Sequence, residues 1–114
     1  MPGKTVIGLL EKVILISPTE RKKRVIARID TGATKSSIDA KLAAELSLGP
    51  IVETKLVKSA SGSKLRPVIT STIKIAKKTM KEKFTIADRG HMKYKVLIGQ
   101  NILKKGFLID PAKK

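Results

Sequence analysis

The sequence predicts a mainly β fold formed by a single domain over residues 1–114. Hydrophobic residues make up 41% of the chain but aromatic residues only 3%. The core must therefore consist of Val, Ile, Leu and Ala, and the β-branched members of that set favour strands. A chain of this length can bury one core, but it is short for an enzyme that must enclose a substrate unaided, so a partner copy would help.

The first elements expected are two strands joined as a hairpin. Residues 5–16 and 24–29 are rich in Val and Ile, and the polar stretch between them contains Pro18. Such a hydrophilic break between two β-prone runs is typical of a turn. The second strand leads directly into the motif Asp30-Thr31-Gly32.

A short helix is expected next, over residues 37–46. Apolar side chains recur there at every fourth position, and either Ser37 or Asp39 can act as its N-terminal cap. Gly49-Pro50 then ends the helix.

The second half of the chain predicts a mobile hairpin and a final set of short elements. Residues 51–58 and 65–76 are β-prone and flank a tip of small polar residues. This candidate flap consists of Ser59, Ala60, Ser61, Gly62, Ser63 and Lys64. Further strands are expected over 81–87, 94–98 and 107–109, with a turn at 88–90 and a short helix at 101–105, which Gly106 follows.

Asp30-Thr31-Gly32 is the most informative motif of the chain. It ends the apolar run 25–29 and is followed by Ala33, so one carboxylate lies at the edge of the core. The Thr31 hydroxyl can hydrogen-bond to backbone across a tight junction, and Gly32 allows close approach because it has no Cβ. A second signal is the apolar run that ends at Ile98-Gly99 before the last helix.

These two segments, in this order around a candidate flap, resemble the retropepsin-like aspartic proteases. Within that group the chain is most similar to the family known as ATP-dependent zinc proteases, which are associated with ATP-grasp glutamate ligases. The likeness runs through most of the chain. It rests on Ala27-Arg28-Ile29-Asp30-Thr31-Gly32-Ala33, Ser36-Ser37-Ile38, Arg66-Pro67-Val68, Asp88-Arg89, Met92, Leu97-Ile98-Gly99 and Leu108-Ile109-Asp110-Pro111.

The resemblance implies a closed β-barrel of the retropepsin-like (acid protease) type with one or two short helices. It implies an aspartic-type peptidase in which Asp30 is catalytic and a mobile flap covers the bound peptide, excluding water. The expected supporting residues are Thr31, Gly32, Ala33, Ile98 and Gly99.

Aspartic proteolysis needs two carboxylates that share one proton, so that one acts as a base and the other as an acid. The chain contains no second Asp-Thr-Gly and no Asp-Ser-Gly. A twofold homodimer that brings Asp30 to its symmetry mate is therefore the direct inference. Asp39 and Asp88 are the alternatives within one chain, but cap or turn roles suit both better.

The zinc and ATP in the family's name find no support in these residues. The chain has no glycine-rich phosphate loop followed by Lys-Ser or Lys-Thr, and His91 is its only histidine, with no cysteine at all. We expect no cofactor and no metal. Many relatives also carry basic residues where this chain has Thr34 and Gln100, positions whose charge pair braces the dimer in retropepsins.

The net charge of +16 bears on partners, since 20 of the 25 basic residues are lysines spread over the whole length. Such a field attracts acidic peptide substrates, and also nucleic acid. Because the resembled family is associated with glutamate ligases, the resemblance implies glutamate-rich substrates in particular. Two alternative functions stay open: a basic nucleic-acid-binding or ribosome-binding β-barrel, and a protease fold kept as an inactive binding module. Because residues 5–16 are interrupted by charges, too short to span a membrane and not followed by a signal cleavage site, we expect a cytoplasmic protein without membrane attachment.

Overall fold

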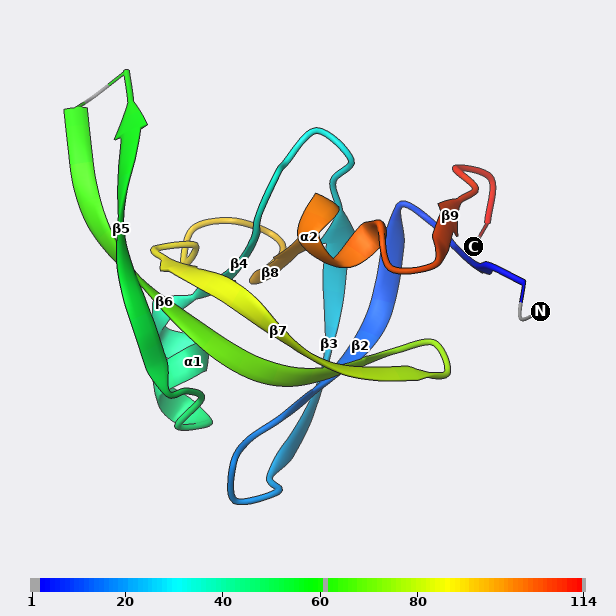
Figure 1. The fold of residues 1–114 in the computed structure, drawn as a ribbon, viewed down its shortest axis with the longest axis horizontal. Coiled ribbons are helices and arrows are strands. Elements are labelled where there is room, and N and C mark those ends of the chain that lie inside the picture. Colours follow the sequence, from blue (N-terminus) through cyan, green and yellow to red (C-terminus); the bar gives the residue numbers. More distant parts are fainter. Residues whose placement is uncertain (1–2, 61, 114) are drawn as a thin grey trace.

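The computed structural model describes residues 3–60 and 62–113 and confirms a mainly β fold (Figure 1). Two short helices accompany the strands. The elements are β1 (Thr5–Ile7), β2 (Leu10–Ile16), β3 (Lys22–Ile29), β4 (Ser36–Asp39), α1 (Ala40–Glu45), β5 (Ile51–Ser59), β6 (Gly62–Ile75), β7 (Lys78–Ala87), β8 (Val96–Ile98), α2 (Gln100–Leu103) and β9 (Phe107–Ile109).

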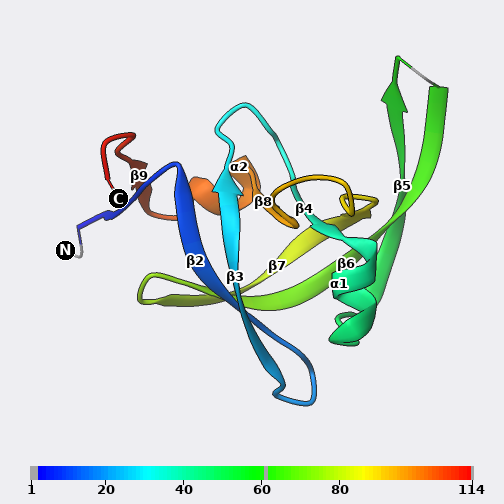
Figure 2. The ribbon, with the colours of Figure 1, turned by 180° about the vertical axis from the view of Figure 1, so that it is seen from behind.

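Six strands form a closed barrel, as the resemblance implied. They follow one another in the order β2-β3-β8-β4-β7-β6, and pairing of β6 with β2 closes the circle. β5 pairs with β6 alone and lies at the free edge of the sheet. β1 and β9 form a separate parallel pair beside the barrel, near both ends of the chain (Figures 1 and 2).

The barrel is filled by aliphatic side chains that alternate along the strands. In β6, for example, Ile69, Ser71, Ile73 and Ile75 are buried, and the residues that alternate with them, Thr70, Thr72 and Lys74, are half-buried or exposed. This period of two is the one that a strand with a single buried face requires. Phe84 of β7 is the largest fully buried side chain. The core is thus mainly aliphatic, as the sequence predicts, but it also contains Phe84 and Phe107.

The first hairpin is confirmed, with one correction. β2 and β3 pair antiparallel as expected, but residues 5–16 are two strands and not one. The strand is interrupted at Gly8, where a Cβ atom would lie 2.9 Å from the carbonyl oxygen of Lys113. The segment before this break belongs to β1, which pairs with β9.

The expected helix over residues 37–46 is partly wrong, because Ser36–Asp39 forms strand β4. Ile38 is fully buried and pairs with Val96 of β8 and with Ile86 of β7, so barrel pairing overrides the helical spacing of the apolar residues. The helix begins only at Ala40, with Asp39 as its N-cap. No helix within the described residues has the length and apolar character needed to cross a membrane.

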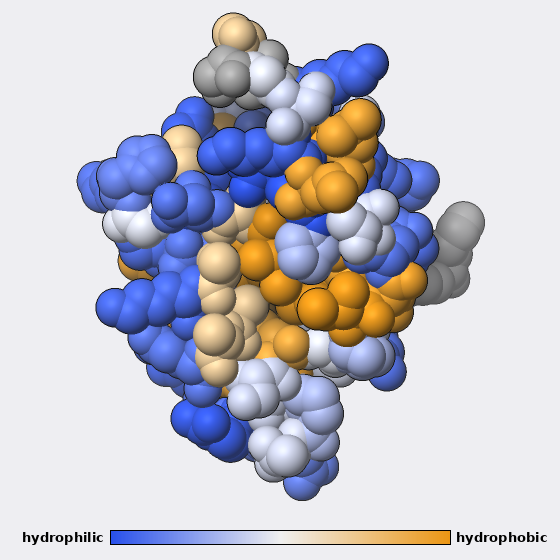
Figure 3. All heavy atoms as spheres, turned by 90° about the vertical axis from the view of Figure 1, so that its left-hand side faces the viewer, coloured by the Kyte–Doolittle hydropathy of each residue, from blue (hydrophilic) through white to orange (hydrophobic). Residues whose placement is uncertain are grey.

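β5 and β6 form the hairpin that the sequence predicts, and this hairpin extends well beyond the barrel (Figure 1). Its strands carry large exposed apolar side chains at Ile51, Val52, Leu56 and Leu65. Apolar surface accordingly gathers on the side of the molecule that this hairpin forms (Figure 3). Ser61, one of the predicted flap residues, lies outside the described residues.

Candidate active site

Asp30 lies where strand β3 leaves the barrel. The backbone N–H of Asp30 donates to the carbonyl of Ile98 (2.9 Å), which extends the parallel pairing of β3 with β8 by one residue. Ile29 before it is buried, whereas Asp30 itself is half-buried. The strand therefore fixes the backbone of Asp30 and leaves its carboxylate at the surface of the core.

A tight turn after Asp30 holds one carboxylate oxygen. The N–H of Gly32 donates to Asp30 Oδ1 (2.9 Å), and the N–H of Ala33 donates to the carbonyl of Asp30 (3.2 Å). A Cβ atom at residue 32 would lie 3.3 Å from Oδ1, which is close enough to disturb this contact. Oδ2 accepts no hydrogen bond from residues 3–60 or 62–113, so it remains available to a ligand.

The loop of residues 30–35, here called the Asp30 loop, is tied to the start of α2. The N–H groups of Gln100 and Asn101 donate to the carbonyls of Ala33 (2.8 Å) and Thr34 (3.2 Å). The Gln100 side chain donates through Nε2 to the carbonyl of Thr31 (2.8 Å). Thus Gln100, which stands where relatives place a basic residue, bonds within its own chain.

The Asp30 loop passes close to the backbone of Gly99, the residue that precedes α2. A Cβ atom at residue 99 would lie 2.3 Å from the carbonyl oxygen of Lys35 and 2.8 Å from that of Ala33. Both atoms belong to the backbone, so no side-chain rotation relieves the overlap. The backbone of Gly99 is extended (φ −106°), a conformation that any residue can adopt. Glycine is therefore required at position 99 by the lack of space for a side chain and not by the backbone conformation.

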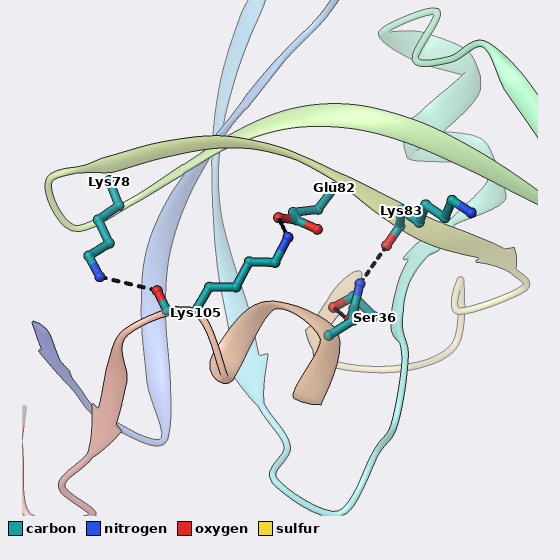
Figure 4. A network of polar contacts seen from close by, with 6 residues as sticks. Ser36, Lys78, Glu82, Lys83 and Lys105 are labelled. Atoms are coloured by element: carbon teal, nitrogen blue, oxygen red, sulfur yellow. Dashed lines mark hydrogen bonds and ion pairs between the residues drawn. The ribbon is translucent and has the colours of Figure 1, made fainter. Parts of the chain in front are cut away.

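A buried serine and an asparagine fix the other end of the Asp30 loop. The Ser36 hydroxyl accepts from the N–H of Gly99 (2.9 Å) and donates to Asn101 Oδ1 (2.7 Å). Asn101 Nδ2 donates in turn to the carbonyl of Lys83 in β7 (3.1 Å; Figure 4). Sequence reasoning did not assign a role to Ser36 or Asn101. A serine two residues before the buried Ile38, hence on the inner face of β4, was the available signal.

Two arginines give Asp30 a basic environment, which sequence reasoning also missed. Arg89 is half-buried, and its Nε donates to the carbonyl of Tyr94 (3.1 Å). Burial lowers the pKa of Arg89, and the charge of Arg28 lowers it further, whereas Asp39 and Asp30 raise it. Arg28 precedes Asp30 by two residues in an extended strand, so the two side chains leave the same face of β3.

The other candidate carboxylates have structural roles, as the sequence predicts. Asp39 caps α1 through Leu42 N–H (3.3 Å) and also accepts from the N–H of Arg89 (2.8 Å). Asp88 accepts from the N–H of Gly90 within a turn (3.1 Å). His91 is exposed. Across the described part of the chain, no three His, Cys, Asp or Glu residues are grouped as metal ligands.

A groove of about 590 Å³ separates the Asp30 loop from the long hairpin. Gly32 and Ala33 line it together with residues 34–37, and residues 55–58 of β5 form the opposite wall. The hairpin thus lies across from the Asp30 loop, as a flap requires. Among the predicted flap residues, Ala60, Gly62, Ser63 and Lys64 do not line the groove, and the role of the tip as a lid stays a prediction.

A family model described as "RimB-like: Retropepsin-like aspartic endopeptidase RimB" matches residues 41–114. The matched segment includes the long hairpin, β8 and Gly99, and it begins after Asp30. Among curated proteins, the "Probable alpha-L-glutamate ligase" of Desulfotalea psychrophila (strain LSv54 / DSM 12343) is 31% identical over 64 residues. These residues are 55% of this chain but only 14% of that protein.

Two solved structures share the fold. Protein Lpg0085 of Legionella pneumophila subsp. pneumophila str. Philadelphia 1, described as having unknown function, has a TM-score of 0.67 and 21% identity, and the match covers 96% of this chain and 95% of that one. The Simian Foamy Virus (mac) protease has a TM-score of 0.61 and 16% identity, over 83% of this chain and 91% of that one.

The contact at Gly99 gives a test of how the Asp30 loop is held. We expect Gly99→Ala to lower the free energy of unfolding by about 1–3 kcal/mol, because the new methyl group overlaps two backbone carbonyls. Urea denaturation measures the change. Gly3→Ala is the matched control, since nothing lies within 4 Å of a Cβ atom there. Equal stability of the two variants would contradict the tight contact.

Proposed function

The chain belongs to the RimB-like family of retropepsin-like aspartic endopeptidases, and from that membership we propose that it is a homodimeric aspartic peptidase. Asp30 of each chain activates water for attack on a peptide carbonyl. The observation that carries this proposal is the Asp30 carboxylate itself. It is half-exposed, one oxygen is fixed by Gly32, and the other is unbonded among the described residues.

The second carboxylate comes from a second copy of the chain. Asp39 and Asp88 are occupied by a helix cap and a turn, so neither is free to join Asp30. A twofold axis beside Asp30 brings the same residue of two chains together, because a symmetric interface uses one surface patch twice. Two carboxylates held within about 3 Å share one proton, and the ionised member then acts as base towards water.

Exposed apolar side chains near Asp30 support such an interface. The carbonyl of Leu9 accepts from the N–H of Ile29, which places Leu9 beside the end of β3. Leu9 is 51% exposed and its neighbour Leu10 is 42% exposed. Burying such surface stabilises an assembly by roughly 25 cal/mol per Å². The Thr31 hydroxyl, exposed and unbonded among the described residues, is free to meet the partner's backbone.

The proposed substrate is an acidic peptide. The groove is lined by the basic residues Lys35, Lys55, Lys58 and Arg66 and by no Asp or Glu among the described residues. The net charge of +16 adds a long-range attraction for anionic chains. The likeness to a probable alpha-L-glutamate ligase fits glutamate-rich peptides in particular.

The long hairpin is the proposed lid. Leu56 and Leu65 face each other across its two strands and are 51% and 72% exposed. A mobile hairpin that presents apolar side chains above a groove can close on a peptide and exclude water from the reaction. In this proposal the tip from Ser59 to Lys64 moves towards the bound peptide.

Replacing the proposed catalytic carboxylate tests the mechanism. We expect Asp30→Asn to lower kcat by about 10³-fold or more on an acidic peptide library, because an amide can neither take nor give the shared proton. Its Oδ1 can still accept from Gly32, so folding and dimerisation are retained. Asp88→Asn is the control for loss of one carboxylate and keeps full activity.

Two results would contradict this mechanism. One is cleavage by Asp30→Asn at a rate close to that of the wild type. The other is silence from wild type and variant alike in samples shown to be folded and dimeric, which favours a protease fold used only for binding.

The substrate class has its own test. We expect a glutamate-rich peptide to be cleaved with a kcat/KM about tenfold or more above that of the same peptide with each flanking Glu replaced by Gln. The difference should shrink as salt screens the lysines of the groove. Steady-state kinetics at low and high ionic strength measure it. Equal rates for both peptides would contradict the proposed preference for acidic substrates but not the proposed peptidase activity.

A further inference from the structure

A second concave site lies on the outer side of the groove. It has a volume of about 400 Å³ and lies between β5, β7 and the residues that follow α2. Six lysines from separate segments of the chain converge on it: Lys35, Lys55, Lys81, Lys83, Lys104 and Lys105. We call this site the lysine pit.

The wall of the lysine pit is held in place by polar contacts. Lys105 forms an ion pair with Glu82 of β7, and Lys78 donates to the carbonyls of Lys105 (3.2 Å) and Gly106 (3.0 Å). These contacts fix the segment after α2 against β7 (Figure 4). The side chain of Lys83 points away from the Lys105–Glu82 pair (Figure 4), and its Nζ lies 4.0 Å from Oε1 of Glu53, with which it forms an ion pair.

The remaining four lysines of the pit are not neutralised. Lys35, Lys55, Lys81 and Lys104 are exposed and form no hydrogen bond or ion pair through their side chains with any residue in 3–60 or 62–113. Like charges gathered in a concavity repel one another and raise the local positive potential. An anionic ligand relieves this repulsion, so the pit is suited to carboxylates or phosphates.

The lysine pit and the groove are continuous. Lys35, Lys55 and Thr85 line both of them. A peptide that occupies the groove beside the Asp30 loop therefore has a direct path past these three residues into the pit. The shared residues therefore favour a single ligand that occupies the groove and the pit together.

We propose that the lysine pit is an exosite that binds acidic side chains of the substrate outside the groove. The proposal rests on the peptidase function above and deepens it. Carboxylate side chains suit the pit better than nucleic acid does, because its lining contains no aromatic residue on which a base could stack. The buried Val68 also lines the pit and offers an apolar contact for the methylene groups of a glutamate side chain.

Charge reversal in the pit tests the proposal. The variant Lys81→Glu/Lys104→Glu alters two lysines that line the pit but not the groove. The control Lys22→Glu/Lys41→Glu makes the same change of charge at exposed residues that line neither. Two glutamate-rich peptides are compared, one just long enough to fill the groove and one extended by further glutamates at both ends.

We expect the pit variant to raise KM for the extended peptide about tenfold, with kcat unchanged and with little effect on the short peptide. The control variant should affect both peptides slightly and equally. An equal loss on both peptides for the pit variant would mean general electrostatic attraction and would overturn the exosite. No loss on the extended peptide would overturn it as well.

Binding measured without cleavage separates this proposal from the catalytic one. The extended peptide, labelled for fluorescence anisotropy, is titrated with Asp30→Asn and with the same variant carrying the pit substitutions. A tenfold weaker affinity of the second protein for the extended peptide, with the short peptide bound equally by both proteins, supports the exosite even if the chain cleaves neither peptide. A single-stranded DNA oligonucleotide that binds more tightly than the peptide, and loses its binding on charge reversal, would assign the pit to nucleic acid instead.

Discussion

The candidate site depends on the absence of a side chain at residue 99. The backbone of the Asp30 loop passes so close to Gly99 that a single methyl group would overlap the carbonyls of Ala33 and Lys35. This contact lets the first turn of α2 donate its free N–H groups to the loop, and it places the Gly99 N–H on the Ser36 hydroxyl. A helix too short to be stable alone thus becomes the support of the proposed catalytic residue.

Basic side chains surround the proposed catalytic residue and the groove beside it. Arg28 and Arg89 act electrostatically near Asp30, while lysines line the groove and continue into the lysine pit. Ordinary surface lysines contribute mainly to solubility. Here several of them converge from β5, β7 and the end of α2 on one side of the hairpin, where a bound peptide would leave the groove. The positive charge is therefore concentrated on the side of the molecule where the substrate is proposed to bind.

Much of this fold was predictable from local patterns. Strand periodicity and turn residues predicted the β2–β3 and β5–β6 hairpins, and the run into Asp30 marked the end of β3. The start of α1 was not predictable in this way, because Ser36–Asp39 is held as a strand by pairing with β7 and β8, which are distant in sequence. Ser36 and Asn101 were missed for the same reason, since the hydrogen bond between them joins residues 65 positions apart in the sequence.

A site shared between two chains is tested most directly by mixing subunits. Wild type is allowed to exchange with a threefold excess of Asp30→Asn, and peptide cleavage is measured per wild-type chain. If each site needs two Asp30 residues, only dimers of two wild-type chains are active, and activity falls to about a quarter of its unmixed value. Exchange with Asp88→Asn, which retains Asp30, should leave activity unchanged. An unchanged rate with Asp30→Asn, in a sample shown to have exchanged, would contradict the shared site.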